Sequence, residues 1–190
     1  MKNKTFNILL TTIGRPTLKR MIDSIYPQLL KDDYLTIVAD CNLSEVLLQL
    51  NDCIKNAVCT INIIQNSEML GFFGHGSRNK WQDSLLGDYL LHGDDDDVYT
   101  SDAMDIIRQH CTESKLYIFK MLYNFTEMPR TPVIEFGNIG TPCGVIPNKK
   151  CCFFPIWELE YGGDFKFYKA VSECMDFEFI DKVIYRIRES

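Results

Sequence analysis

Apolar runs of strand length alternate with apolar residues at helical spacing along the first half of the chain. The runs are rich in Ile, Leu, Val and Tyr, side chains that suit a pleated, half-buried surface and therefore indicate strands. The predicted strands cover residues 5–11, 34–39, 58–64 and 88–93.

Three amphipathic helices are predicted between these strands. Thr17 is placed to cap the first helix, whose apolar positions keep a helical period until Pro27 disturbs it. The second helix opens at Ser44, and the third covers residues 77–86. The buried face of the second helix is predicted to comprise Val46, Leu47, Leu50 and Ile54.

Strands that alternate with helices predict right-handed crossovers and a mostly parallel central sheet flanked by helices, an α/β fold. In such sheets ligands bind beyond the carboxyl ends of the strands, near the switch in strand order. Asp40, the Gly14-Arg15 turn and the aspartates from Asp94 to Asp97 would all lie at that edge.

The second half of the chain is more irregular and richer in β-structure. Gly and Pro interrupt its short apolar segments, as in hairpins. We predict one domain of residues 1–190, divided into halves at about residue 99. The elements expected after that point are a helix at 101–110, strands at 116–123, 132–136 and 143–146, a helix at 165–175 and a closing strand at 177–187.

Composition narrows the class of partner and the cellular setting. The net charge of -6 and a pI of about 5.1 argue against a nucleic-acid backbone as the main partner. The apolar run near the N-terminus is too short for a signal peptide or a membrane span, so a cytoplasmic protein is expected. The 8 cysteines contain no C-x-x-C pair, which favours buried reduced thiols over disulfides or a zinc site.

Four consecutive carboxylates, Asp94 to Asp97, follow the apolar strand directly. In an extended chain Asp94 and Asp96 would point to one side, and hard oxygen ligands of this kind suit Mg²⁺ or Mn²⁺. The competing interpretation is a solvated acidic turn that caps the following helix.

These motifs resemble those of the GT-A glycosyltransferases, in particular the family-2-like group that uses nucleotide-diphosphate sugars. The resemblance runs through residues 8–16, Asp40, 66–74 with Arg78-Asn79, the D-x-D of Asp94 and Asp96, and residues 162–165. It implies a GT-A fold in which residues 1–99 bind the nucleotide sugar and residues 100–190 form a smaller acceptor and catalytic half. The chain also resembles the compact glycosyltransferases of bacterial surface-polysaccharide pathways and those with which large algal DNA viruses help to glycosylate a capsid protein. The viral kind is slightly favoured, and it would place the protein in the host cytoplasm.

The resemblance implies the following donor contacts. Asp40 would accept a hydrogen bond from a uracil ring, which favours UDP over other nucleotides, and Arg78 would lie near the diphosphate. Asp94 would lie near the ribose and share the metal, Mn²⁺ or Mg²⁺, with Asp96. The other nucleotide-binding residues implied are Thr12, Gly14, Arg15, Gly71 and Asp95.

Asp164 resembles the catalytic carboxylate of inverting family members. The family commonly has Glu-Asp after Gly-Gly, whereas Asp164 alone follows Gly163 here, which leaves Glu158 and Glu160 as alternative bases. No histidine follows His110, so the cation would depend on Asp96, the diphosphate oxygens and water.

The implied reaction is metal-dependent transfer of a hexosyl group from a UDP-sugar to a hydroxyl of a glycan or glycoprotein acceptor. A bound cation would neutralise the charge that develops on the leaving diphosphate, and a carboxylate base would take the acceptor proton. Trp157 and Tyr161 are candidates for an aromatic acceptor platform, while His75 is expected to be exposed and His92 packed. The alternatives are a catalytically inactive sugar-nucleotide-binding module and a sugar nucleotidyltransferase.

Overall fold

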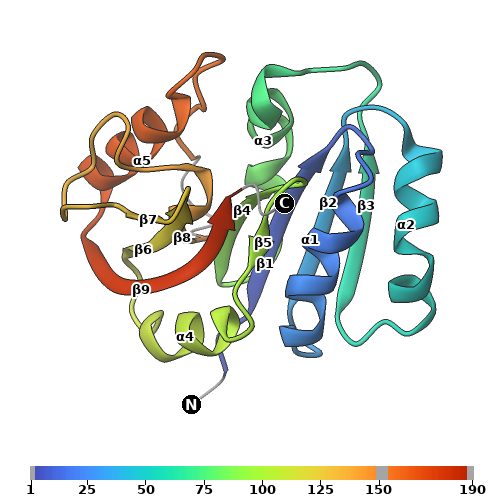
Figure 1. The fold of residues 1–190 in the computed structure, drawn as a ribbon, viewed down its shortest axis with the longest axis horizontal. Coiled ribbons are helices and arrows are strands. Elements are labelled where there is room, and N and C mark those ends of the chain that lie inside the picture. Colours follow the sequence, from blue (N-terminus) through green and yellow to red (C-terminus); the bar gives the residue numbers. More distant parts are fainter. Residues whose placement is uncertain (1–2, 149–153, 188–190) are drawn as a thin grey trace.

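A computed structural model describes residues 3–148 and 154–187 of the chain (Figure 1). Within these ranges nine strands form one sheet in the order β3-β2-β1-β4-β8-β6-β9-β5, with β7 paired to β6. This arrangement confirms the predicted α/β class, with a mostly parallel central part and helices against it.

The parallel part of the sheet consists of β1 (Phe6–Thr12), β2 (Tyr34–Ala39), β3 (Thr60–Gln65) and β4 (Tyr89–Asp94). Every residue of β1 is buried, because this strand lies between β2 and β4 with both faces covered. The chain visits β2 and β3 on one side of β1 before it crosses to β4 on the other. The switch in strand order therefore lies between the carboxyl ends of β1 and β4.

Three helices connect these strands: α1 (Leu18–Ile25), α2 (Leu43–Lys55) and α3 (His75–Trp81) (Figure 1). Two of the predicted details are wrong. The Thr17 side chain makes no capping hydrogen bond, because its backbone is already helical. In α2 the buried side chains are Val46, Leu50 and Cys53, whereas Leu47 and Ile54, one position further along from Val46 and Cys53, are 41% and 43% exposed.

The second half of the chain completes the sheet with antiparallel and parallel pairs. In Figure 1 the long β9 curls around one side of the molecule, with α4 below it and α5 above. Its elements are β5 (Val98–Tyr99), α4 (Ala103–His110), β6 (Leu116–Tyr123), β7 (Thr126–Met128), β8 (Gly144–Pro147), α5 (Gly163–Cys174) and β9 (Phe177–Ile187).

The boundaries predicted for β2, β6 and β9 agree with the structure, since long apolar or alternating runs define them. The strand predicted at 132–136 is wrong, because those residues lie in an irregular loop and the hairpin partner of β6 is instead β7. Gly and Pro near that segment had indicated a hairpin whose strand lies a few residues earlier.

Six cysteines fall within the described residues, and all six are free. Burial raises the pKa of Cys59 to about 11 and that of Cys143 to about 12, so both thiols stay protonated at neutral pH. Cys41 is half-buried and Cys174 exposed, contrary to the expectation of general burial, and Cys151 and Cys152 lie outside the described residues. No helix in the described ranges is both long and apolar enough to cross a membrane.

Asp33 ties β1, the turn before β2 and α4 together. Its carboxylate accepts hydrogen bonds from the amides of Phe6 (3.0 Å) and Leu30 (2.8 Å) and forms an ion pair with Arg108. We expect Asp33→Ala to lower the free energy of unfolding by about 3 kcal/mol, because it leaves a buried amide and a largely buried guanidinium without their acceptor.

Chemical denaturation measures this change, and Asp32→Ala is the matched control because Asp32 is an exposed neighbour. Equal stability of the two variants would contradict the role assigned to Asp33.

Candidate functional site

Two adjoining cavities open at the switch point between β1 and β4. The smaller, of about 300 Å³, lies at the end of β1 and is bordered by Asp40 and Gly71. The larger, of about 380 Å³, lies over the second half of the chain and includes Asp164. Phe73, Asp94 and Asp96 line both cavities, so the two spaces meet at these side chains.

The four aspartates of the run all border one or both cavities, but they differ in exposure. Asp94 ends β4, and a turn begins at Asp95. The side chains of Asp94 and Asp96 are 31% and 33% exposed, whereas Asp95 and Asp97 are buried. The run does form a turn, but only two of its four carboxylates are partly exposed. It does not cap the following helix, because α4 begins after Asp102.

Arg15 lies against two of these carboxylates. Its Nη1 donates to Asp95 Oδ1 at 2.9 Å and lies 3.1 Å from Asp96 Oδ2. Thr12 donates its hydroxyl to Asp95 Oδ2 at 2.6 Å and accepts from the amide of Gly14, whose φ of 84° suits glycine. Burial raises the pKa of Asp95 in spite of the Thr12 and Arg15 contacts.

Arg78 is fully buried behind the aspartates and lines neither cavity. Its Nη2 donates to Asp94 Oδ1 at 2.5 Å and its Nη1 to the carbonyl of Phe73 at 2.8 Å. The guanidinium also lies 5.1 Å from the ring centroid of Trp157. The structure thus places Arg78 where it positions Asp94 and Phe73.

Asp40 is buried at the carboxyl end of β2 and holds the loop that follows β3. Oδ1 accepts from the amide of Leu70 and the side chain of Asn66, both at 2.8 Å, and Oδ2 accepts from the amide of Gly71 at 2.7 Å. Burial by itself raises the pKa of Asp40, but these hydrogen bonds and one from Ser77 outweigh it and hold the pKa below its usual value.

Asp164 lies in the first turn of α5 and faces the larger cavity. Burial raises its pKa, with a further contribution from the negative charge of Asp94, although the amide of Phe165 donates to Oδ1 at 2.7 Å. The alternative bases differ from it. Glu158 and Glu160 are about half exposed and both pair with Lys166, and only Glu160 borders the cavity.

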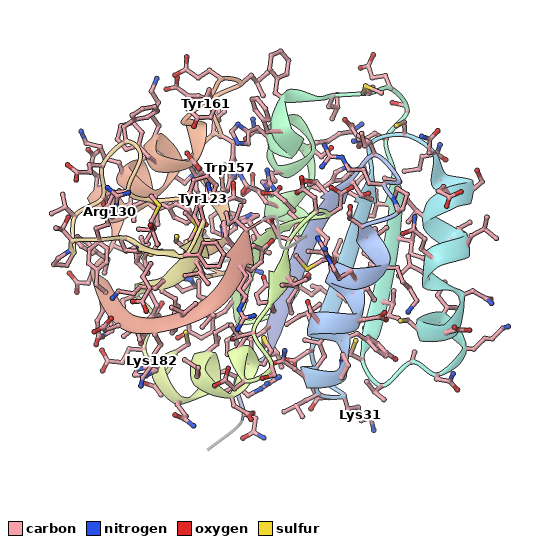
Figure 2. All side chains as sticks on the ribbon, in the orientation of Figure 1. Lys31, Tyr123, Arg130, Trp157, Tyr161 and Lys182 are labelled. Carbon is pink, nitrogen blue, oxygen red and sulfur yellow. The ribbon has the colours of Figure 1, made fainter. Side chains whose placement is uncertain are left out.

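The aromatic and histidine predictions are partly corrected. Trp157 is fully buried, where it stacks on Phe167 with ring centroids 4.0 Å apart, so it cannot form a platform, whereas Tyr161 is 81% exposed (Figure 2). His75 is buried rather than exposed, and its Nδ1 lies 2.8 Å from the carbonyl of Glu158. His92 is packed, as predicted, against the edge or face of Trp157 and Phe167.

Sequence reasoning missed two residues at the larger cavity, Phe73 and Phe136. Phe73 belongs to a quoted motif, but only its glycine neighbours drew attention there. Phe136 lies in an irregular loop with no periodic pattern. A glycine directly follows each of them in the sequence, Gly74 and Gly137, and this pairing could have marked both segments as shaped turns. In the structure both glycines adopt positive φ, 81° and 75°.

Asp94 and Asp96 are the residues that could hold a divalent cation. Arg78 contacts Oδ1 of Asp94 and Arg15 contacts Oδ2 of Asp96, and both aspartates border the space that the two cavities share. Within the described residues no group of three or more His, Cys, Asp or Glu forms a metal site. Two carboxylate oxygens fit Mg²⁺ or Mn²⁺ when a diphosphate and water supply the other ligands.

Comparisons with known proteins place this fold. No protein-family model matches the sequence, and no curated protein does. Among solved structures, S. aureus TarS 1–349 matches with a TM-score of 0.74 and 17% identity over 96% of this chain and 60% of that chain. The same TarS fragment in complex with UDP-GlcNAc matches with a TM-score of 0.72 and 15% identity over 98% of this chain and 59% of that one.

A third structure, GalNAc-T7 with UDP, GalNAc and Mn²⁺, matches with a TM-score of 0.63 and 13% identity over 97% of this chain and 43% of the other. This chain therefore spans about 60% of the TarS fragment that it matches. The likeness shows that the fold is GT-A-like.

The loop held by Asp40 gives a pH-dependent prediction. Because the folded-state pKa of Asp40 is lowered, its ionised form stabilises the protein above the unfolded-state pKa, and this contribution is lost as pH falls through the folded-state value. We expect Asp40→Asn to be less stable than the wild type by about 2 kcal/mol at pH 7, with a difference that shrinks below pH ~4.

Thermal unfolding of both proteins between pH 3 and 8 measures this difference. Asp52→Asn is the control, since Asp52 is exposed on α2. A stability gap that stays constant over the whole pH range would contradict the ionised role of Asp40.

Proposed function

We propose that this chain is a glycosyltransferase that moves a hexosyl group from a UDP-sugar to a hydroxyl of a glycan or glycoprotein acceptor. The observation that carries the proposal is the junction of two cavities at Asp94 and Asp96, with the carboxylate of Asp164 in the larger one. A reaction between two substrates needs two such spaces that meet where the bond is exchanged.

The smaller cavity suits the nucleotide diphosphate. Neighbours of the same fold were solved with UDP or UDP-GlcNAc, which supports a UDP-sugar for this chain. Gly71 allows close approach of the backbone. Thr12 borders the same cavity, and its hydroxyl accepts a hydrogen bond from the amide of Gly14. Oδ2 of Asp40 accepts one hydrogen bond, from the amide of Gly71, and a carboxylate oxygen can accept a second. That second hydrogen bond would come from an N–H of the uracil ring.

Asp164 suits the role of general base. In the proposed step the acceptor oxygen forms a bond to the anomeric carbon, the bond from that carbon to the diphosphate breaks, and the electron pair leaves with UDP. Asp164 takes the acceptor proton, and its raised pKa makes it a better base than an exposed aspartate. Attack from the side opposite the leaving group would invert the anomeric configuration.

Asp94 and Asp96 would hold the divalent cation, Mn²⁺ or Mg²⁺. The cation would neutralise negative charge on the diphosphate. The GalNAc-T7 neighbour was solved with Mn²⁺, which supports this choice of ion. Arg78 fixes Asp94 from behind, and Arg15 fixes Asp96 from the side of the smaller cavity. These two guanidinium groups would keep the carboxylates oriented before the donor binds.

The more specific expectations stay predictions. These are the inverting course, the division into halves at residue 99, the algal-virus origin with a capsid acceptor, and the cytoplasmic location. A binding module without catalysis would show UDP-sugar binding without turnover even with Asp164 intact, so the experiment below also decides that alternative.

Two substitutions test donor binding and base catalysis separately. We expect Asp96→Ala to weaken UDP-sugar binding in Mn²⁺ by about tenfold, because the ion loses a ligand. Asp164→Asn should bind the donor normally but transfer or hydrolyse it at least ~100-fold more slowly. Calorimetry and UDP release measure the two effects, and Mn²⁺ binding by Asp96→Ala can be followed independently by electron paramagnetic resonance.

Asp105→Ala on the exposed side of α4 is the control and should change neither quantity. Absence of UDP-sugar binding by the wild-type protein with Mn²⁺ present would refute the proposal, and equal binding with chelator would refute its metal dependence.

The pH dependence of kcat/KM tests whether Asp164 is the general base. Because burial and Asp94 raise the pKa of Asp164, the ionised form needed for proton removal is lost at higher pH than for an exposed aspartate. We expect kcat/KM for UDP-sugar to fall on the acid side with a midpoint above pH ~4. A rate that is flat down to pH 4 would contradict Asp164 as the base.

A further inference from the structure

Four exposed aromatic side chains border the larger cavity. We name three of them, Phe73, Phe136 and Tyr161, the aromatic rim, because the ring of Tyr161 contacts the other two. They are 69%, 60% and 81% exposed. Exposed aromatic side chains gathered at one cavity mark a binding surface more often than scattered ones do. Tyr161 lies in the part of the molecule that also carries Arg130 (Figure 2).

The rim forms from three segments that are distant in the sequence. The ring of Tyr161 packs edge-to-face against Phe73 (centroids 6.5 Å apart) and against Phe136 (5.9 Å). Phe73 comes from the turn before α3, Phe136 from the loop before β8, and Tyr161 from the turn before α5. Tyr161 therefore links the other two rings at the border of the larger cavity.

Local features hold two of these rings in place. Gly162 gives the ring of Phe136 its room, because a Cβ there would lie 2.5 Å from that ring. Phe72 and Phe73 both adopt positive φ, 52° and 56°, a conformation that costs about 1–3 kcal/mol per residue. The hydrogen bond from Arg78 to the carbonyl of Phe73 supports this strained turn. A strained turn that exposes a large apolar ring at a cavity indicates a role outside folding.

The polar lining shows which chemistry fits against these rings. Asp94, Asp96, Asp97, Glu160 and Asp164 border the larger cavity, and Arg130 is the one Lys or Arg among the described residues that do so. Carboxylates accept hydrogen bonds from hydroxyl groups and repel anions. A sugar ring presents hydroxyl groups at its edge and C–H groups on its face, and the face can lie against aromatic rings.

Size argues against a protein partner in this space. A volume of about 380 Å³ is in the range of small-molecule sites and far below that of a protein–protein interface. We infer that the aromatic rim binds the apolar face of an uncharged pyranose ring, the acceptor sugar, next to Asp164. This inference rests on the proposed function, and it adds the class of acceptor and the residues that select it.

Tyr161→Ala is the sharpest test, because this exposed side chain contributes little to folding. Binding of methyl glycosides of glucose, galactose, mannose and N-acetylglucosamine is measured by ligand-observed nuclear magnetic resonance, beside glucose 6-phosphate. We expect at least one neutral glycoside to bind the wild type and to bind Tyr161→Ala about 3- to 10-fold more weakly, and Tyr161→Phe to restore binding. The KM of a transferred acceptor should rise by the same factor.

Hydrolysis of the UDP-sugar by water, measured on the wild type, reports the donor site separately, since that reaction needs no acceptor sugar. Phe125→Ala serves as the control, because Phe125 is 98% exposed and does not border the cavity. The inference is overturned if no glycoside binds, if Tyr161→Ala binds glycosides as the wild type does, or if the sugar phosphate binds better than the neutral sugar.

Failure of the proposed function looks different. The wild-type protein could bind the glycosides at the rim but neither bind nor hydrolyse UDP-sugars. That result would support the binding role of Tyr161 and refute the transferase function. The wild type could instead hydrolyse UDP-sugars while Tyr161→Ala binds glycosides as the wild type does. That result would support the transferase function and refute sugar binding by the aromatic rim.

Discussion

The buried ion pair between Arg78 and Asp94 is the interaction on which the rest of the site depends. The buried guanidinium donates from its Nη atoms to Asp94 and to the carbonyl of Phe73, and it lies over the ring of Trp157. These groups belong to the end of β4, the turn before α3 and the segment before α5. One charged group thus sets the relative position of the three segments that surround the cavities.

The loop between β3 and α3 is held by charge at both ends. Asp40 accepts hydrogen bonds from the amides of Leu70 and Gly71, and Arg78 donates one to the carbonyl of Phe73. Fixing both ends allows the turn between them to keep unfavourable backbone angles that an unsupported loop would relax. The result is that Phe73 borders both cavities instead of packing into the core.

The four adjacent carboxylates of the aspartate run repel one another, and the fold places them in different environments. Asp95 is buried with Thr12 and Arg15, while Asp94 and Asp96 keep part of their surface in the shared space. The positive charges of Arg78 and Arg15 lower the repulsion between the neighbouring carboxylates. Such a pair is oriented and still negatively charged, which is the state a cation and a diphosphate require.

The sequence by itself determined the α/β class, the bounds of β2, β6 and β9 and the position of the aspartates after a buried strand, because each follows from local periodicity. It also singled out Asp40 and Asp164, which border the cavities. Only the tertiary structure decided that His75 and Trp157 are buried and that Phe73, Phe136 and Tyr161 meet. Burial and contact between distant segments depend on how the strands and loops pack, and no local pattern along the chain encodes that packing.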